Sequence, residues 1–527
     1  MIGNVKFYND WANALKDKYL ENIVVHPLSP EEIHTHRLQT WDLIVKINEL
    51  RAYKQRIAPQ HDSAAENRLF LVTRQYYLMM PRLFRVNELP AEILGNIFHY
   101  MIWSSSHSVN SRLALTSVCR LWRNIAIGDA TLWNAIWFRD PPHYERSLAW
   151  LQRSGNGQLD VRIGDTDNHK ITAQEMSVLF DRLEEKIGQI RIFVSVAESW
   201  EANLEVLRGF NAYGKRGLPL AMEHLELHYP GASLVHTGND LGPQGYQPLS
   251  LFGGAVAPHL KNILLNKVPV NWEMSHLSNL RNLDLRSIPP HRFPPLSVFR
   301  GMLKSSPNLF KLYLESAGPK WERNNSEANE PISLPNMKIL ILSDFSLGYA
   351  MYILGQIQAP GVRDLALMNL MGEDYTPLFA FLTDKFPDLR MLTMWSVETA
   401  SSRLMVKWLS SMPKLTFLKV HNLQPHFLSF FLECPNPASA KTSRALKDRV
   451  VCPELSILEV ESFNPDIVLQ WVVSRQGRGV PLKKLYSSPS FFERLTPEQH
   501  QTLCRLTMLY RLEEGVSVPE EDTLLED

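Results

Sequence analysis

The chain has 527 residues, of which 45% are hydrophobic and 21% are charged, and its 55 basic side chains balance 55 acidic ones. This composition is typical of a folded globular protein rather than of a disordered or collagen-like chain. One hydrophobic core rarely organises so many residues, so at least two domains are expected. The formal net charge of zero gives no support for nucleic acid or a membrane surface as a partner.

The cysteines are few, and no two of them have the CxxC spacing. They are Cys119, Cys434, Cys452 and Cys504. This usage indicates a reducing compartment and argues against a disulfide scaffold or a zinc finger. The first residues lack the apolar stretch of a signal peptide, and no run is long enough to span a bilayer. We therefore expect a cytoplasmic or nuclear protein, in which the glycosylation sequon at Asn324 is a chance match.

A helical segment is expected at residues 29–86, after an N-terminal segment at residues 1–28. Ser29, Pro30 and Glu32 form a typical helix start with a capping box. The residues that follow alternate three and four apart along a short heptad seam. The seam positions are Ile33, His36, Thr40, Leu43, Ile47, Leu50, Lys54 and Ile57. Because several of them are polar, packing onto the following domain and weak self-association through residues 33–57 both remain open.

Residues 87–140 combine three motifs in a fixed order. The segment opens with Leu89-Pro90-Ala91-Glu92-Ile93-Leu94, continues with Val118-Cys119-Arg120-Leu121-Trp122-Arg123 and closes with Leu132-Trp133. In order and spacing these motifs closely resemble an F-box. The layout, with a helical segment before the motifs and repeats after them, is most similar to that of fungal-type F-box proteins.

The resemblance implies a small all-α domain that binds a Skp-type adaptor protein. The segment also carries more apolar surface than so small a module can bury, which is typical of a partner site. The residues that we expect to contact the adaptor are Leu89, Pro90, Ile93, Leu94, Ile97, Phe98, Leu115, Val118, Cys119, Trp122, Leu132 and Trp133. The alternative is that these residues pack against the following domain.

One apolar pattern recurs through residues 187–485. Its clearest copy places apolar side chains at Leu260, Ile263, Leu265 and Val268. Further clear copies begin at Leu280, Met337, Val362, Leu389, Leu415 and Leu455. Most copies follow one another at about 25–29 residues, and a unit of this length cannot bury its apolar face without stacking on neighbours.

Each copy predicts one β-strand, because its second and third apolar positions lie two residues apart and point to the same side. Helical patterns fill the gaps between copies, as after Thr376-Pro377 and Asn464-Pro465, where a capping residue precedes proline. The pattern resembles that of leucine-rich repeats, which carry Asn or Cys near the eighth or ninth position. Here that position is apolar, as at Val268 and Phe463.

We therefore predict an α/β fold in which residues 141–511 form an irregular leucine-rich-repeat solenoid, a curved parallel sheet backed by helices. A small all-α F-box domain and an N-terminal helical segment precede it. The alternative is a series of unrelated αβ units. Residues 512–527 are acidic and are expected to form a solvated, mobile tail.

Side chains between the inward positions of each strand are expected to line the concave face of the sheet. In the later copies these side chains include aromatic and Met residues, which are costly to expose and often mark a partner site. The predicted substrate-binding residues are Ile341, Met368, Met391, Trp395, Phe417, Lys419 and His421. If the segment after Leu485 covers them instead, the loops around Asn239 and Asn324 become the next candidates.

Common catalytic and phosphate-binding motifs, including GxxxxGK[ST], HExxH and GxSxG, are absent from the sequence. His34 and His36 are two apart and do not share a helix face, so no metal site is expected there. We therefore expect a protein that is not an enzyme and needs no cofactor.

The resemblances imply a substrate receptor of an SCF-type ubiquitin ligase, which binds a target protein and reaches a cullin scaffold through the adaptor. One alternative is a scaffold that binds the adaptor without supporting ubiquitination. Another is a solenoid regulator such as a GTPase activator, which would need an Arg-rich ridge that this sequence lacks.

Overall fold

The structure is a computed structural model that describes residues 29–58, 62–83, 85–104, 108–231, 247–322, 330–398, 402–433, 450–512 and 518–526. The predicted N-terminal segment, residues 1–28, lies outside the described residues. The chain divides into two compact units, a helical unit at Met1–Leu132 and a sheet unit at Trp133–Asp527.

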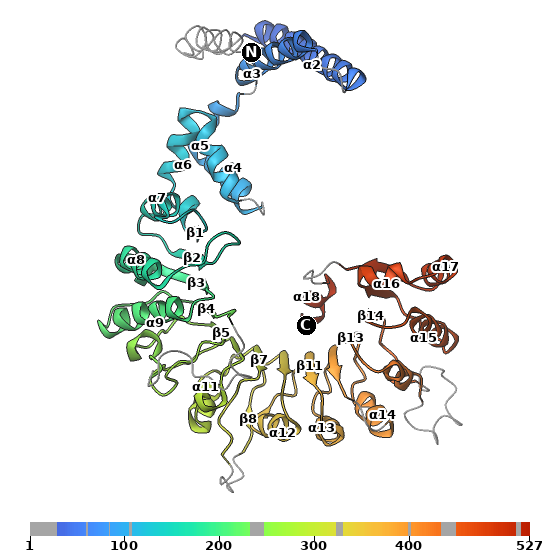
Figure 1. Ribbon diagram of the computed structural model, residues 1–527. Helices are drawn as coiled ribbons and strands as arrows, with labels where there is room; N and C mark the ends of the chain where they lie inside the picture. The colour runs from blue at the N-terminus through green and yellow to red at the C-terminus, as the bar shows by residue number, and fades with distance from the viewer. Residues whose placement is uncertain are drawn as a thin grey trace. The chain divides into compact units, whose positions relative to one another are not determined.

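The described part of the helical unit contains only helices (Figure 1). They are α2 (Pro30–Ile57), α3 (Ser63–Leu83), η1 (Arg85–Glu88), α4 (Ala91–Trp103), α5 (Ser108–Val118), α6 (Arg120–Gly128) and η2 (Ala130–Trp133), the last of which crosses the boundary between the units. The predicted start of α2 is confirmed. The backbone amide of Glu32 donates to Ser29 Oγ, and the amide of Ser29 donates to Glu32 Oε2.

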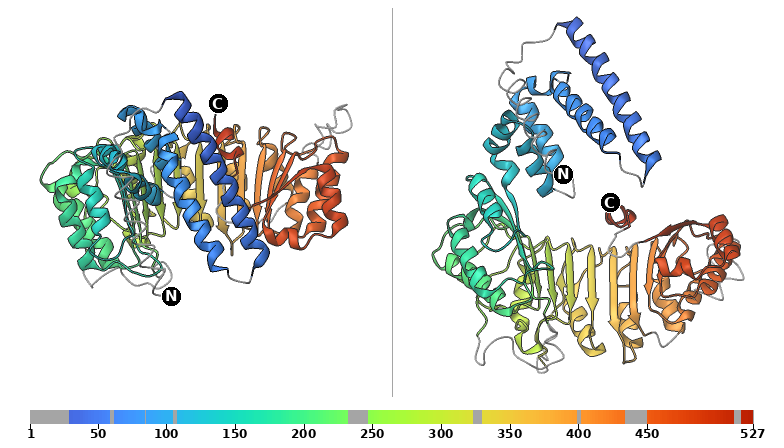
Figure 2. Two further views of the ribbon diagram at one scale, coloured as in Figure 1. Left: turned by 90° about the horizontal axis from the view of Figure 1, so that it is seen from above. Right: turned by 45° about the horizontal axis from the view of Figure 1, so that its top comes forward.

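The heptad seam of α2 lies against α3, which runs beside it as the second arm of a helical hairpin (Figure 2). Thr40, Leu43 and Ile47 are the buried residues of α2. Lys54 Nζ, on the same helix, lies 2.6 Å from Glu66 Oε1 on α3. Because α3 of the same chain occupies the seam, the expectation of self-association through residues 33–57 loses the surface on which it rested.

The sheet unit is built on one 14-stranded sheet. Its strands are β1 (Ala135–Phe138), β2 (Leu159–Gly164), β3 (Ile190–Val196), β4 (His224–His228), β5 (Asn262–Asn266), β6 (Asn282–Arg286), β7 (Lys311–Glu315), β9 (Ile339–Ser343), β11 (Asp364–Leu370), β12 (Met391–Val397), β13 (Phe417–His421), β14 (Ile457–Glu461), β15 (Lys484–Ser487) and β16 (Met508–Arg511). Neighbouring strands pair in parallel and follow chain order. A short second sheet pairs β8 (Ile332–Ser333) with β10 (Ile357–Gln358).

Helices connect most of the strands and lie on the outer side of the curved sheet, whereas the strands line its inner side (Figure 1). They are α7 (Glu145–Arg153), α8 (Ala173–Leu183), η3 (Glu184–Gln189), α9 (Trp200–Lys215), η4 (Leu251–Gly254), η5 (Pro290–Arg292), α11 (Leu296–Lys304), α12 (Leu347–Gly355), α13 (Thr376–Leu382), α14 (Ser402–Ser410), η6 (Pro425–Leu432), α15 (Pro465–Gly477), α16 (Pro489–Glu493) and α17 (Pro497–Leu506). The last helix, α18 (Glu520–Leu525), follows the final strand and lies on the inner side. As predicted, the Asn464 side chain caps α15, where it accepts from the amide of Asp466.

The strands lie where the repeated pattern predicts them. In the clear copies, the second and third apolar positions of the pattern, such as Ile263/Leu265 and Leu392/Met394, are buried on the helix side of the sheet. Equivalent residues of neighbouring strands stand side by side, so that Leu365 pairs with Leu392. The two faces of the sheet are therefore divided as the period of two requires.

A left-handed residue turns strand after strand into its outgoing loop. The sixth residue, counted from the strand start, has a positive φ in β5, β6, β7, β9, β11, β12, β13 and β14. These residues are Lys267, Ser287, Ser316, Asp344, Asn369, Ser396, Asn422 and Ser462. Several of their amides donate to the fifth residue of the next strand, as from Ser316 to the Ser343 carbonyl at 3.0 Å. This hydrogen bond offsets part of the cost of a conformation that non-glycine residues rarely adopt.

Two features of the sheet unit bear on the predicted boundaries. The sheet begins at β1, before the end of the segment assigned to residues 87–140, because Ala135 pairs with Asp160 of β2. The tail at residues 512–527 was expected to be solvated along its length. Instead Val518 is buried and α18 packs on the sheet, whereas residues 513–517 lie outside the described part of the chain.

Leu367→Ala tests the stacking of the repeats. Leu367 is fully buried in β11, so truncation should lower the free energy of unfolding by about 2–5 kcal/mol. Denaturant unfolding followed by circular dichroism measures this loss. The control is Met371→Ala, because Met371 follows the same strand and is exposed. Equal unfolding free energies for the two variants would contradict the assigned register.

Candidate functional site

Helices α4, α5 and α6 form a small module around one apolar core. Leu94, Phe98 and Ile102 lie four residues apart on one face of α4 and are all buried. The Phe98 ring packs on that of Trp122 in α6, with their centroids 5.0 Å apart. Leu115 of α5 is buried as well. The periodicity of α4 therefore assigns one face to the core and leaves the other to solvent.

Polar contacts fix the end of α4. The indole Nε1 of Trp103 donates to His99 Nδ1 at 3.2 Å, and His99 Nε2 lies 3.0 Å from Asp129 Oδ2. Because Nδ1 accepts, the ring proton is placed on Nε2, which donates to Asp129. Arg112 Nε donates to the Leu132 carbonyl, and burial lowers the pKa of Arg112 to about 10. These contacts hold the helices rigidly together.

One end of the module presents apolar side chains to solvent. Trp122 Nε1 donates to Asn87 Oδ1 at 2.8 Å and so joins α6 to η1, which precedes α4. Close to this junction in the sequence, four apolar side chains are exposed: Leu89 just before α4, Ile93 in its first turn, Val118 at the end of α5 and Leu121 at the start of α6. We call these four residues the exposed apolar face.

On the sheet unit, the inner face carries a charged network along β4 to β7. His224 Nε2 lies 2.6 Å from Glu226 Oε1, and hydrogen bonds from His224 and His228 hold the pKa of Glu226 far below its usual value. Further along, the Arg286 guanidinium forms two 2.7 Å hydrogen bonds with the Asp284 carboxylate. It also lies over the Tyr313 ring at 4.1 Å. This part of the face is polar, and most of its charged side chains already have hydrogen-bond partners on the same face.

The later strands differ, because α18 lies on their inner face. Met391, Phe417, Ile457 and Tyr486, one from each of β12 to β15, form a buried cluster with Val518. Leu512 and Leu524 pack against the edge of this cluster. An apolar patch on the inner face is therefore covered by a segment of the same chain.

Residues 86–139 match the family model described as F-box-like. The chain carries an F-box-like domain. No curated protein matches the chain at a significant level. The matched range contains the α4–α6 module and ends just after β1, the first strand of the sheet unit. F-box domains generally bind Skp-type adaptors, which gives this module a role in protein interaction.

Within the F-box-like domain, the predicted adaptor-binding residues divide by burial. Leu89, Pro90, Ile93 and Val118 are exposed, whereas Ile97, Cys119 and Trp122 are half-buried. Leu94, Phe98, Leu115, Leu132 and Trp133 are buried within the chain, and direct contact of these five with the adaptor stays a prediction. Leu94, Phe98, Leu115 and Leu132 support the domain from within, whereas Trp133 belongs to the sheet unit and packs on Trp150 of α7.

Further apolar residues of this domain are exposed that the list of predicted adaptor-binding residues does not include. They are Tyr100, Met101, Leu113, Leu121 and Ile127. The signal was present in α4, where the buried residues Leu94, Phe98 and Ile102 leave the positions between them on the other face. Strict use of the helical period would have separated core residues from surface residues.

The predicted substrate-binding residues also divide. Met391 and Phe417 are buried under residues of the chain's last segment, so the hypothesis that they form an open binding surface is withdrawn for them. Trp395 remains 46% exposed and stacks on the His421 ring at 5.2 Å. Ile341 and Met368 are half-buried. The alternative loops around Asn239 and Asn324 lie outside the described residues.

The two charged candidates on β13 already have partners within the chain. His421 lies between two carboxylates, with Nδ1 2.7 Å from Glu461 and Nε2 3.1 Å from Glu459. Burial opposes the charged form of His421, but these hydrogen bonds raise its pKa above the usual value. Lys419 Nζ lies 2.7 Å from Glu521 of α18. A partner that engaged these side chains would have to replace existing contacts.

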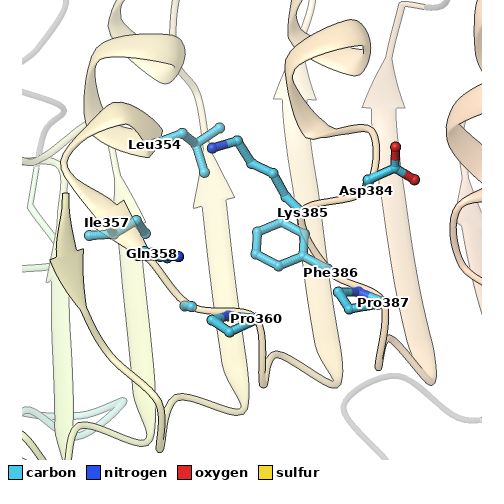
Figure 3. A pocket seen from close by; sticks show the side chains of 9 residues that line it. Leu354, Ile357, Gln358, Pro360, Asp384, Lys385, Phe386 and Pro387 are labelled. Atoms are coloured by element: carbon cyan, nitrogen blue, oxygen red, sulfur yellow. The ribbon is translucent and has the colours of Figure 1, made fainter. Parts of the chain in front are cut away.

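A hollow of about 280 Å³ lies between neighbouring repeats (Figure 3). It is lined by Leu354, Ile357, Gln358, Ala359, Pro360, Asp384, Lys385, Phe386 and Pro387. Lys385 extends toward Leu354, whereas Asp384 lies at the far side, so the lining gathers no set of convergent polar groups. Among the described residues, no group of His, Cys, Asp and Glu could hold a metal ion. No helix in the described ranges is long and apolar enough to cross a membrane.

Asp364 generates a prediction about pH. Burial raises the pKa of this carboxyl group, at the start of β11, to about 7, and its buried Oδ1 has no hydrogen-bond partner among the described residues. In the unfolded chain Asp364 ionises near the usual aspartate pKa of about 3.9, whereas the folded chain resists its ionisation until about pH 7. The contribution of Asp364 to stability should therefore fall as pH rises between these two values.

Asp364→Asn removes this titration. Between about pH 4 and pH 7, the unfolding free energy of the wild type should fall relative to that of the variant. Urea unfolding at several pH values measures the difference. A difference that is constant across this range would show that Asp364 ionises normally in the folded chain.

Proposed function

We propose that this chain is the substrate-recognition subunit of an SCF-type ubiquitin ligase. The F-box-like domain docks on a Skp-type adaptor, which links the chain to a cullin scaffold, and the sheet unit binds the target protein. The observation that carries this proposal is the F-box-like domain at residues 86–139. In this role the chain performs no chemistry and acts in the cytoplasm or the nucleus.

The exposed apolar face supports docking of the adaptor. Leu89, Ile93, Val118 and Leu121 stand on, or next to, helices that are already packed around Leu94 and the other core residues. Apolar side chains that stay exposed on a folded module indicate a protein partner. Because the helices that carry them are held by their own core, docking requires little ordering of the backbone.

The sheet unit is proposed to be a leucine-rich-repeat solenoid that binds the target. Support comes from parallel strands that follow chain order, each with its apolar pair on the helix side. Stacked repeats of this kind create extended binding surfaces on their inner side. A receptor of this design raises the local concentration of target lysines near the conjugating enzyme, and orientation supplies the rest of its effect.

The adaptor contact is tested with the double variant Ile93→Ala/Val118→Ala. Truncation of interface anchors typically costs about 2 kcal/mol or more, so adaptor affinity should fall by at least about tenfold. Both residues are exposed, so the fold should be retained. Calorimetric titration of a purified Skp-type adaptor into the full chain measures the affinity, and circular dichroism checks the fold.

The matched control is Val178→Ala/Val473→Ala, which truncates two exposed valines on α8 and α15 of the sheet unit. Its adaptor affinity should equal that of the wild type. Unchanged affinity in the Ile93/Val118 variant would refute the docking face.

Affinity purification of the full chain from cells tests the ligase role. The intact chain should recover adaptor and cullin together, and the Ile93/Val118 variant should lose both. Recovery of the adaptor without a cullin would contradict the ligase role and favour a scaffold.

A further inference from the structure

The segment that contains α18 packs apolar side chains on the inner face of the later strands. Val518, just before the helix, is buried among Met391, Phe417, Ile457 and Tyr486. Leu524, at the other end of the helix, packs against the edge of the same cluster. Apolar side chains at both ends of this short segment therefore pack on the same apolar cluster of the sheet.

The acidic residues between these two apolar side chains meet basic residues of the sheet. Glu521 Oε1 lies 2.7 Å from Lys419 Nζ of β13. Glu520 pairs with Lys484 of β15 and accepts hydrogen bonds from the Tyr486 hydroxyl at 2.9 and 3.0 Å. The charges of the sheet and of α18 are therefore complementary at two adjacent positions.

Two arginines hold the backbone at the end of the segment. Arg363 Nη1 donates to the carbonyls of Leu525 and Glu526, both at 2.7 Å. Arg390 Nη1 donates to the carbonyls of Leu524 and Glu526, at 3.2 and 2.7 Å. Contacts to carbonyls do not depend on side-chain identity, so these arginines would hold another peptide backbone in the same place.

We infer that this surface is a docking site for an acidic peptide segment of the target protein, and that α18 occupies the site in cis. The segment that fits carries an apolar residue, two acidic residues shortly after it and a second apolar residue, as in Val518, Glu520, Glu521 and Leu524. The inference rests on the proposed function, whose substrate class it specifies. The site consists of the apolar cluster together with Lys419, Lys484, Arg363 and Arg390.

The sheet also has an apolar face that α18 does not cover. The apolar pairs of β12 to β14, including Leu392, Leu418 and Leu458, are fully buried on the opposite, helix-backed face. Helix α18 has six residues, too few for a helix that is stable without tertiary contacts. A segment of this kind can open locally while the rest of the structure stays folded. The site is therefore covered but can be vacated.

The test uses the full chain and a fluorescein-labelled synthetic peptide with the sequence of residues 518–526. In the wild type α18 competes with the probe, so the apparent affinity is the intrinsic affinity multiplied by the fraction of chains in which α18 is open. Glu520→Lys/Glu521→Lys should release α18 and tighten probe binding by at least about tenfold. Fluorescence anisotropy measures the affinity, and hydrogen exchange of residues 518–526 reports the release.

The matched control is Asp522→Lys/Glu493→Lys, which makes the same change of charge at two exposed side chains, one in the same segment and one at the end of α16. Its affinity for the probe should equal that of the wild type. A second probe, with glutamine at both positions equivalent to Glu520 and Glu521, should bind the released variant at least about tenfold more weakly than the first probe.

Two results would overturn the inference. One is a released α18, with fast exchange, and no gain in probe binding. The other is an α18 that stays protected in the Glu520/Glu521 variant, because the ion pairs would then not hold it. Adaptor binding, measured on the same preparations, distinguishes failure of the peptide site from failure of the proposed function. A wild-type chain that does not bind the adaptor would refute the proposed function. A chain that binds the adaptor but whose released variant gains no affinity for the probe would refute the peptide site alone.

Discussion

The structure of the sheet unit depends on the burial of each strand's apolar pair against the neighbouring repeats. Leu365 and Leu367 are completely buried because β9 and β12 stand on either side of β11 in register. No repeat could exclude water from these side chains by itself, so the stability of each unit comes from its neighbours. The long parallel sheet and its outer helices follow from this requirement.

The same alternation that buries one face determines the chemistry of the other. Residues between the buried pairs stand on the inner face, where β4 to β7 carry His, Asp, Arg and Glu side chains in mutual contact. From β12 to β15 that face becomes apolar at one row and basic beside it. The left-handed corners keep strands in register, so side chains from successive repeats line up into continuous rows. A surface with such rows is suited to an extended peptide.

The two units divide the work that we propose. The F-box-like domain encloses Leu94 and Phe98 and exposes Val118 and Leu121, so a partner meets a preformed surface. In the sheet unit, the side chains on the inner face differ in chemistry from strand to strand, whereas the apolar pairs that hold the sheet together lie on the helix side. In the docking site that we infer, occupation by α18 would couple target binding to release of a segment of the same chain. The affinity for a target would then depend on how often α18 opens.

The sequence by itself determined the features that come from local periodicity. The spacing of Ile263 and Leu265 is enough to predict a strand and its buried side, because side chains alternate between the two faces and five residues are enough to show this period. The motifs around Pro90 and Trp122 likewise identify their segment, which matches the F-box-like family. The capping box at Ser29 predicts a helix start for the same local reason.

Only the tertiary structure decided which predicted surface residues are covered. Phe417 stands on the inner side of its strand, as its position predicts, yet it is completely buried because Val518 and its neighbours lie on it. Lys419 and Glu521 are 102 residues apart, and no local pattern specifies that two such distant residues meet. The burial of Asp364 and the pairing of the α2 seam with α3 have the same origin. Periodicity states which side a residue faces, whereas contacts between distant segments decide what that side touches.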